Sequence, residues 1–296
     1  MQLTQLFKYV YDMGVTSMEF IKGYRYDDDL RRSFNDLAMK TFGIEFEDWY
    51  EAGYWTDKYI PYSFVENGKV IANVSVNIVQ LIIDRQVVPA VQIGTVMTDK
   101  EYRNLGLSRL LMEKVLSDYQ HIEIMYLFAN ETVLEFYPKF GFERMEETLY
   151  SVNVNSKGKN KPPKIKDFNF IYEYASRRGI FSHFGTSSTE ELLLFYVQMV
   201  FTNDVYFLEQ DSAIVICKNA GSALHLYDVI SEKEVNLFNI IDQLSNEETL
   251  KAVFHFTPEL ADLNMERYQE GNVLFVRNKG NFKFPKHFKH PITSQA

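Results

Sequence analysis

The six residues from Arg103 to Ser108 have the types and spacing of an anion-binding turn. Arg103 carries a permanent positive charge, and its forked N–H donors suit the oxygens of a phosphate. Gly106 lets the backbone approach a phosphate with no side chain in the way. The turn leads into a predicted helix, whose first N–H groups lack internal partners and attract anions. The turn therefore predicts a phosphate cradle.

A strand and a helix are expected to hold this turn in place. Residues 91–98 are apolar with Gly and Thr interruptions, which is typical of a buried strand. After the turn, four apolar side chains recur at helical spacing, namely Leu107, Leu110, Leu111 and Val115. The stretch 91–116 thus predicts a strand, a phosphate turn and a helix in succession.

This stretch resembles motif A of the GNAT N-acetyltransferases, R/Q-x-x-G-x-G/A, with Ser108 in the last small position. The preceding residues 96–103 also match a common family form, V-x-T-x-x-x-Y-R. Downstream, residues 130–142 resemble the family segment N-x-x-a-x-x-x-Y-x-x-x-G-F. In that segment Asn130, Tyr137, Gly141 and Phe142 are in register. Two motifs in the family order strengthen the resemblance well beyond either motif alone.

The resemblance implies acetyl-CoA as the cosubstrate and no metal. The pyrophosphate would lie on the turn, and the pantetheine arm would run along the strand before it. The implied cofactor-binding residues are Val96, Met97, Thr98, Arg103, Asn104, Leu105, Gly106, Leu107, Ser108 and Asn130. A helix-capping role for Asn130 is compatible with this binding role.

The implied reaction is direct acetyl transfer to a primary amine of a small molecule or of a peptide lysine. Backbone N–H groups of residues 96–98 could polarise the thioester carbonyl. Tyr137 would protonate the leaving thiolate, and the alternative for Tyr137 is a packing role. The general base is not readable from the sequence. Seven carboxylates are candidates, namely Glu45, Glu47, Asp48, Glu51, Asp84, Asp99 and Glu101.

The acidic and aromatic segment 45–55 has two interpretations. It could form an acceptor wall, with carboxylates for an ammonium group and aromatic faces for cation–π contact. It could instead be a surface helix with a solvated acidic face and Trp49 or Trp55 in the core. The net charge of −9 is compatible with a cationic acceptor and argues against nucleic acid and anionic membranes as partners.

The chain has 296 residues, of which 46% are hydrophobic and 24% charged, which is typical of a soluble globular protein of two domains. No stretch approaches the roughly 20 apolar residues of a membrane span. The first residues lack a signal-peptide pattern, so a cytoplasmic location is expected. Cys217 is the only cysteine, which excludes an intrachain disulfide and a CxxC metal site, and its apolar surroundings predict a buried thiol.

The expected fold class is α/β, in the α+β sense of a mixed central sheet, arranged as two tandem GNAT-like lobes. The predicted domains are a GNAT domain at 1–154, a Lys- and Pro-rich linker at 155–166, and a C-terminal domain at 167–296. The second half repeats the element order of the first, but its turn at 231–236 has two acids and no glycine. Because acids repel phosphate, the second lobe is expected to lack a cofactor site.

Several elements outside the motifs carry further expectations. Residues 1–18 predict a helix or arm without an assigned function, and 145–154 a strand that closes the first lobe. In the second half we expect a helix near 260–268 and a strand at 273–277. Residues 282–296 predict a loosely ordered basic tail, with solvated His287 and His290.

Three classes of function remain open from the sequence. The leading one is an N-acetyltransferase, because the Arg103, Gly106, Asn130 and Tyr137 positions are all intact. The second is a non-catalytic acyl-CoA-binding or regulatory module, and the third is an assembly scaffold. The identity of the amine, the role of the C-terminal lobe and the oligomeric state cannot be read from the sequence.

Overall fold

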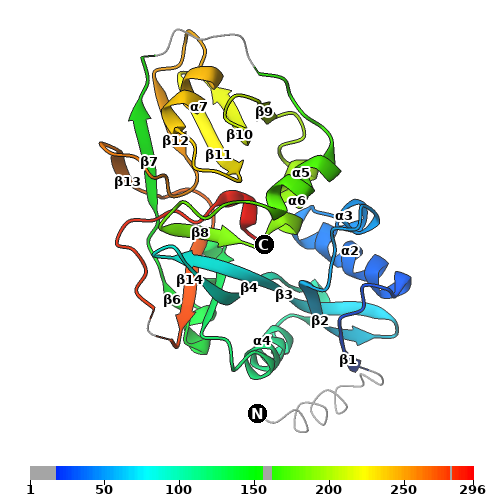
Figure 1. Cartoon of the computed structure of the whole chain (residues 1–296). Helices are drawn as coiled ribbons and strands as arrows, with labels where there is room; N and C mark the ends of the chain where they lie inside the picture. Colours follow the sequence, from blue (N-terminus) through cyan, green and yellow to red (C-terminus); the bar gives the residue numbers. More distant parts are fainter. Residues whose placement is uncertain (1–17, 156–161, 281) are drawn as a thin grey trace.

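The computed structural model describes residues 18–155, 162–280 and 282–296, which form two mixed β-sheets with helices packed on them (Figure 1). The helix or arm predicted for 1–18 lies, apart from Met18, outside the described residues. The helices are α2 (Asp28–Phe42), α3 (Glu47–Glu51), α4 (Leu107–Asp118), α5 (Phe168–Ser176), α6 (Glu190–Met199) and α7 (Leu237–Leu244), with short 3₁₀ turns η1 (Lys100–Tyr102), η2 (Glu131–Val133), η3 (Tyr137–Phe140) and η4 (Ile292–Ser294).

The first sheet has the strand order β1-β2-β3-β4-β5-β14-β6, and β8 also pairs with β3. Its strands are β1 (Met18–Lys22), β2 (Tyr59–Glu66), β3 (Lys69–Ile83), β4 (Gln86–Thr98), β5 (Ile124–Ala129), β6 (Glu143–Arg144), β8 (Phe184–Ser187) and β14 (Val273–Asn278). All neighbours are antiparallel except β4 and β5, which run parallel. The helix α4 connects this parallel pair, as a parallel connection requires.

The second sheet has the strand order β13-β7-β12-β11-β10-β9. Its strands are β7 (Thr148–Asn153), β9 (Val205–Leu208), β10 (Ala213–Ala220), β11 (Ala223–Ser231), β12 (Lys251–Phe254) and β13 (Asn264–Arg267). The expectation that β7 closes the first lobe is wrong, because β7 pairs with β12 and β13. In return β14, from the second half of the chain, lies between β5 and β6 of the first sheet. The strand β8 also comes from the second half and pairs with β3. Across the predicted boundary at 154, the first half therefore gives one strand to the second sheet, and the second half gives two to the first.

The two lobes repeat one unit of structure. In each, an antiparallel strand pair is followed by a helix and a parallel strand, as β3-β4-α4-β5 and as β10-β11-α7-β12. Each parallel ladder is short and ends at Ile93↔Leu127 in the first lobe and at Leu226↔Phe254 in the second. Each central strand also carries a register shift just beyond that point. The repeat predicted from the sequence is thus present as tandem lobes.

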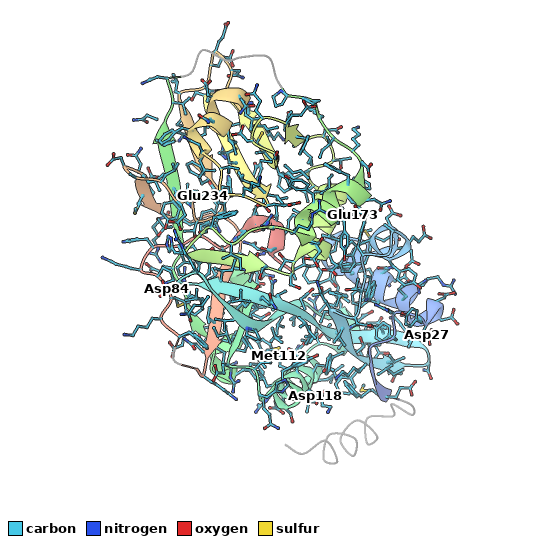
Figure 2. The ribbon with its side chains drawn as sticks, viewed as in Figure 1. Asp27, Asp84, Met112, Asp118, Glu173 and Glu234 are labelled. Carbon is cyan, nitrogen blue, oxygen red and sulfur yellow. The ribbon has the colours of Figure 1, made fainter. Side chains whose placement is uncertain are left out.

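Local sequence explains why the first lobe begins as it does. The side chain of Asp27, labelled in Figure 2, accepts hydrogen bonds from the N–H groups of Asp29 and Leu30 and caps α2. Gly43 ends the helix with a left-handed φ of 71°. Two tight turns with positive φ then connect β2 to β3, at Asn67-Gly68, and β3 to β4, at residues 84–85.

A shared aromatic core joins the lobes. Rings from α2, α3 and β2 pack with apolar side chains from α5, α6, β10 and β11 in one cluster. The indole N–H of Trp49, on α3, donates to the backbone carbonyl of Glu191, on α6, at 2.8 Å. Figure 1 shows α2 and α3 beside α5 and α6 where the two lobes meet. Burial of this cluster stabilises the arrangement of the two sheets.

Two further expectations about the second half are changed by the structure. The helix predicted near 260–268 is wrong, because Asn264–Arg267 is the edge strand β13 with all four residues exposed. The predicted linker is partly ordered, since Pro163 and Ile165 make backbone hydrogen bonds with the β9 strand. Cys217 is buried, as expected. Among the described residues, no helix has the length and apolar character needed to cross a membrane.

Candidate functional site

The Arg103–Ser108 turn leads into α4 through a left-handed glycine. Gly106 is the residue before the helix, has a φ of 79°, and leaves the helix start without a side-chain cap. A Cβ atom placed on Gly106 would meet no atom within 4 Å. The N–H groups at the start of α4 thus have no side-chain cap, and Gly106 before them is not crowded, which is an arrangement that suits a phosphate.

Side chains around the turn fix its two ends. The hydroxyls of Ser108 and Thr98 lie 2.7 Å apart, which ties the start of α4 to the end of β4. The exposed Arg103 donates from Nε to the carbonyl of Thr98 at 3.3 Å. Asn104 adopts a left-handed φ of 66°. The side chain of Leu107, the first residue of α4, is buried. Leu107 can thus offer only backbone atoms to a ligand.

The strands β4 and β5 stop pairing before the turn. Their ladder ends at Ile93↔Leu127, after which β5 pairs only with β14 while β4 continues to Thr98 beside β3. We call this point the fork. Beyond it Thr95 and Val96 together oppose the single residue Val74, which is a β-bulge. The edge of β4 that faces away from β3 has left the β5 ladder over residues 94–98.

In the stretch 96–98, which the sequence assigned to the pantetheine arm, neighbouring side chains pack on opposite faces of the sheet. Val96 packs against the α4 side of the sheet, in the same apolar cluster as Tyr137. Met97 is buried in the aromatic core on the other side. Their side chains are thus anchored in opposite cores, so this stretch offers a ligand mainly its backbone.

The predicted proton donor, Tyr137, is held in an aromatic cluster. It begins η3, is only 5% exposed, and packs against Phe136, Phe142 and Phe275. Phe275 belongs to β14, so the second half of the chain helps to position Tyr137. Burial raises the pKa of Tyr137 to about 12, which keeps the hydroxyl protonated at neutral pH.

Asn130 caps a helical turn in this structure. Its side chain accepts hydrogen bonds from the backbone N–H and the hydroxyl of Thr132, at the start of η2. This is the capping role that the sequence allowed beside cofactor binding. Its position at the end of β5 places it past the fork, so a cofactor contact remains a prediction.

The end of the chain reaches the fork, and the sequence did not anticipate this. The prediction of a loose tail over 282–296 is wrong for its second half, because Phe288, Lys289 and His290 are at most 1% exposed. Gln92, on β4, donates to the carbonyl of Ser294 and accepts from the N–H of Ala296. Figure 1 marks this end of the chain at the centre of the molecule.

Two buried contacts pull this segment inward. The ammonium group of Lys289 lies 3.0 Å from the Glu147 carboxylate, and both side chains are buried. The His290 ring lies within 3.2 Å of the Tyr126 hydroxyl and 3.0 Å of the Pro291 carbonyl. Burial lowers the pKa of His290 to about 3, so the ring is neutral. The prediction of a solvated His290 is therefore wrong, whereas His287 is exposed.

Segment 45–55 does not form the aromatic acceptor wall that one interpretation proposed. Trp49 and Trp55 are both 2% exposed, inside the core that joins the lobes. Glu47 accepts hydrogen bonds from Arg31 and Asn35. The remaining acids of the segment are exposed, namely Glu45, Asp48 and Glu51. The structure therefore matches the alternative interpretation, a surface helix with its tryptophans in the core.

The candidate bases are not gathered at one place. Asp99 forms an ion pair with Lys69, and this partner lowers the pKa of the Asp99 carboxyl. Asp84 lies at the tip of the β3–β4 hairpin (Figure 2). Neither arrangement marks one carboxylate as the base. Among the described residues, no group of three or more potential metal ligands is found.

A cavity of about 270 Å³ lies between the lobes. Its walls come from the β3–β4 hairpin, α5, α6, β11 and η4. Charged groups in the wall are paired, since Arg178 binds Asp228 at 2.7 Å and Glu190 binds Lys58 at 2.7 Å. One wall residue, Thr293, adjoins the Ser294 that contacts Gln92, so η4 stands between the cavity and the fork.

The corresponding turn of the second lobe differs from the Arg103–Ser108 turn in the way the sequence indicated. Asn236 caps α7 with its side chain, so the first N–H groups of that helix are already occupied. Glu232 forms an ion pair with Arg177, and the second acid of this turn, Glu234, is labelled in Figure 2. Beyond the β11–β12 ladder, the N–H of Ile292 donates to the carbonyl of His255. The second lobe thus has a capped helix start, and the segment at Ile292 lies next to β12 where its ladder with β11 ends.

Comparison with known proteins supports one family. Residues 25–145 match the family model described as an acetyltransferase (GNAT) domain. A probable N-acyltransferase of unknown function from Enterococcus faecalis has a similar fold, with a TM-score of 0.62, 16% identity, and coverage of 89% of this chain and 73% of that chain. No curated protein matches the chain.

Two more crystal structures are similar over about nine tenths of this chain. A GCN5-related N-acetyltransferase from Kribbella flavida has a TM-score of 0.59 and 17% identity, covering 90% of this chain and 72% of that chain. Eis1 from Mycobacterium abscessus has a TM-score of 0.60 and 12% identity, covering 90% of this chain and 74% of that chain. Because all three proteins are less than 20% identical to this chain, the comparison shows that they share its fold.

Proposed function

Because residues 25–145 belong to the GNAT acetyltransferase family, we propose that this chain is an acetyl-CoA-dependent N-acetyltransferase acting on a primary amine. The observation that carries the proposal is the start of α4. Its N–H groups have no side-chain cap, a Cβ placed on Gly106 would meet no atom within 4 Å, and Arg103 adds a positive charge. These features suit the pyrophosphate of acetyl-CoA in charge and in access.

Beyond the fork, the edge of β4 that has left the β5 ladder could bind the rest of the cofactor. A pantetheine arm is a long chain with two amide groups, so in its extended form it can hydrogen-bond along a strand edge that has no partner strand. In our proposal it runs along residues 96–98, where β4 has left the β5 ladder. Holding the thioester there beside an amine is catalysis by positioning.

The proposed chemistry is a direct attack. The amine nitrogen bonds to the carbonyl carbon of the thioester, the carbon–sulfur bond breaks, and the products are an amide and the CoA thiol. A cationic amine first loses one proton to water and so gains the lone pair that attacks. As the amide forms, the nitrogen loses a second proton to water, and the leaving sulfur takes one proton from the Tyr137 hydroxyl, which then regains a proton from water. A pKa of about 12 means that Tyr137 still holds this proton at neutral pH.

The acceptor is proposed as a primary amine of a small molecule or of a peptide lysine. The acidic net charge of −9 favours a cationic amine in the encounter with the protein. The buried tryptophans of segment 45–55 do not add to this argument, because their rings have no open face.

A thiol-release assay with acetyl-CoA and a panel of cationic, neutral and anionic amines tests the proposal. We expect release that depends on one class of amine, and acetylated product in equal amount. A non-catalytic acyl-CoA-binding module would give binding of acetyl-CoA by calorimetry without thiol release for any amine. Absence of both binding and release would refute the proposed function in either form.

A further inference from the structure

A buried network of polar side chains lies directly behind the bulge of β4. Three of its members, Ser63, Asn73 and Ser75, are completely buried in the sheet. We call it the bulge network, and its members are Tyr24, Tyr59, Ser63, Asn73, Ser75 and Thr95. Polar groups at the centre of a sheet are unfavourable unless each finds a partner, so their partners show what the network holds.

Asn73 is the centre of the network. Its side-chain oxygen accepts a hydrogen bond from the Ser63 hydroxyl at 2.9 Å. Its amide nitrogen donates to the Ser75 hydroxyl at 2.9 Å and to the backbone carbonyl of Thr95 at 2.8 Å. Both donors and the acceptor of this amide are therefore used, and one of the three bonds reaches across to β4.

Thr95 needs such support, because its backbone is in an unusual conformation. Its φ is 48°, in the left-handed region that β-branched residues rarely adopt. The carbonyl is held by Asn73, and the hydroxyl lies 2.9 Å from the hydroxyl of Tyr59. Two buried partners thus fix a residue that would relax to an extended strand without them.

The geometry of the peptide bond carries this constraint to the next residue. The Thr95–Val96 peptide is trans, so its C=O and its N–H point in opposite directions. Because Asn73 on β3 holds the C=O, the N–H of Val96 points away from the network. Val96 lies beyond the end of the β4–β5 ladder, in the same apolar cluster as Tyr137.

We propose that Asn73 is a positioning residue for acyl transfer, which directs the Val96 N–H at the carbonyl oxygen of the bound thioester. This inference rests on the proposed function. The thioester oxygen gains negative charge as the amine attacks, and a fixed N–H donor lowers the energy of that state. Asn73 itself does not touch the substrate. It acts through the Thr95–Val96 peptide.

Asn73→Asp tests the inference with the least change of shape. The ionised carboxylate cannot donate to the Thr95 carbonyl, so the peptide loses its support. Because burial favours the protonated form, kcat is measured at the alkaline end of the activity range. We expect kcat to fall about 10- to 100-fold, less than the roughly 10²- to 10³-fold loss known for complete removal of one such donor, because the Val96 N–H is still present but no longer fixed. Ser63→Ala is the matched control, because it removes a buried bond of Asn73 but leaves the Asn73–Thr95 bond intact.

Binding measurements supply a readout that a packing role would not change. Calorimetry should show that the wild-type protein prefers acetyl-CoA over CoA, because only acetyl-CoA has the carbonyl. Asn73→Asp should lose this preference and keep its affinity for CoA. Tyr59→Phe removes the second support of Thr95 and should lower kcat in the same direction, which keeps the test decisive if Asn73→Asp does not fold.

Each outcome decides between the two claims. If the wild-type protein neither binds acetyl-CoA nor releases thiol, the proposed function fails and the inference fails with it. If the wild-type protein is active and the folded Asn73 or Tyr59 variants keep its kcat, only the inference is refuted. It is also refuted if Ser63→Ala lowers kcat as much as Asn73→Asp, since the network would then matter only for stability.

Discussion

Replacing Gly106 with glutamate should weaken acetyl-CoA binding strongly and leave the first lobe folded. The site offers room for the side chain, because a Cβ atom there meets no atom within 4 Å. The cost to stability comes from the φ of 79°, which a residue with a side chain adopts at a penalty of about 1–2 kcal/mol. A domain of ordinary stability tolerates this loss.

The effect on binding can be worked from charge. A glutamate at the start of α4 would bring its carboxylate within about 4 Å of the pyrophosphate position, where a pair of unit charges in water repels by about 1 kcal/mol. Two phosphate charges give about 2 kcal/mol, or about a 30-fold weaker Kd. Salt screens this repulsion, so the loss should shrink as ionic strength rises.

Gly106→Gln is the matched control for this substitution. Glutamine has the same length and the same backbone penalty but no charge, and Gly106→Asn tests the left-handed conformation, which asparagine tolerates. Calorimetry with acetyl-CoA at low and high salt gives the Kd of each variant, and thermal unfolding reports the fold. If the Glu and Gln variants bind acetyl-CoA equally at low salt, the pyrophosphate does not lie at Gly106.

Tyr137→Phe should lower kcat about 10²–10⁴-fold with unchanged acetyl-CoA affinity, and steady-state kinetics that show unchanged turnover would leave Tyr137 a packing role. Calorimetry should find one acetyl-CoA per chain, whereas two equal sites would contradict our interpretation of the second lobe. Burial lowers the pKa of His255 and His290 from 6.5 to about 3. The unfolded chain therefore takes up protons first as the pH falls below 6.5, and stability is lost between pH 6.5 and 3. At pH 5 the loss should be about 2 kcal/mol per histidine. Denaturant unfolding at pH 7 and 5 measures it, and an equal stability at both would contradict neutral, buried rings.

The strand, turn and helix around Gly106 could be predicted because their signals are local. Four apolar residues at helical spacing predicted α4, which begins at Leu107 and buries Leu107, Leu110, Leu111 and Val115. The ends of α2 depend on equally local signals, since Asp27 caps its start and Gly43 ends it. Backbone conformation and side-chain periodicity are set within a few residues, so one sequence is enough to read them.

The sheet memberships of β7 and β14 depended on the tertiary structure. Their sequences predicted strands at nearly the right places, but β7 pairs in the second sheet and β14 in the first. Strand pairing is a contact between distant segments, and an alternating or apolar pattern does not name its partner. The placement of Phe275 against Tyr137 follows from this exchange.

Residues whose character is ambiguous by type were also decided by the tertiary structure. The tryptophans of segment 45–55 suited a binding wall or a core, and α6 of the second lobe made them core. Lys289 and His290 are charged or titratable residues that usually prefer water, yet Glu147 and Tyr126 give them buried partners. Asn73 is a further example, because its side chain can hold the Thr95 carbonyl only where β4 forms a bulge beside it. The sequence by itself thus determined the local elements and the phosphate turn, because these depend on neighbours along the chain. The pairing of strands, the burial of polar groups and the surroundings of Tyr137 depend on neighbours in space, which only the folded chain supplies.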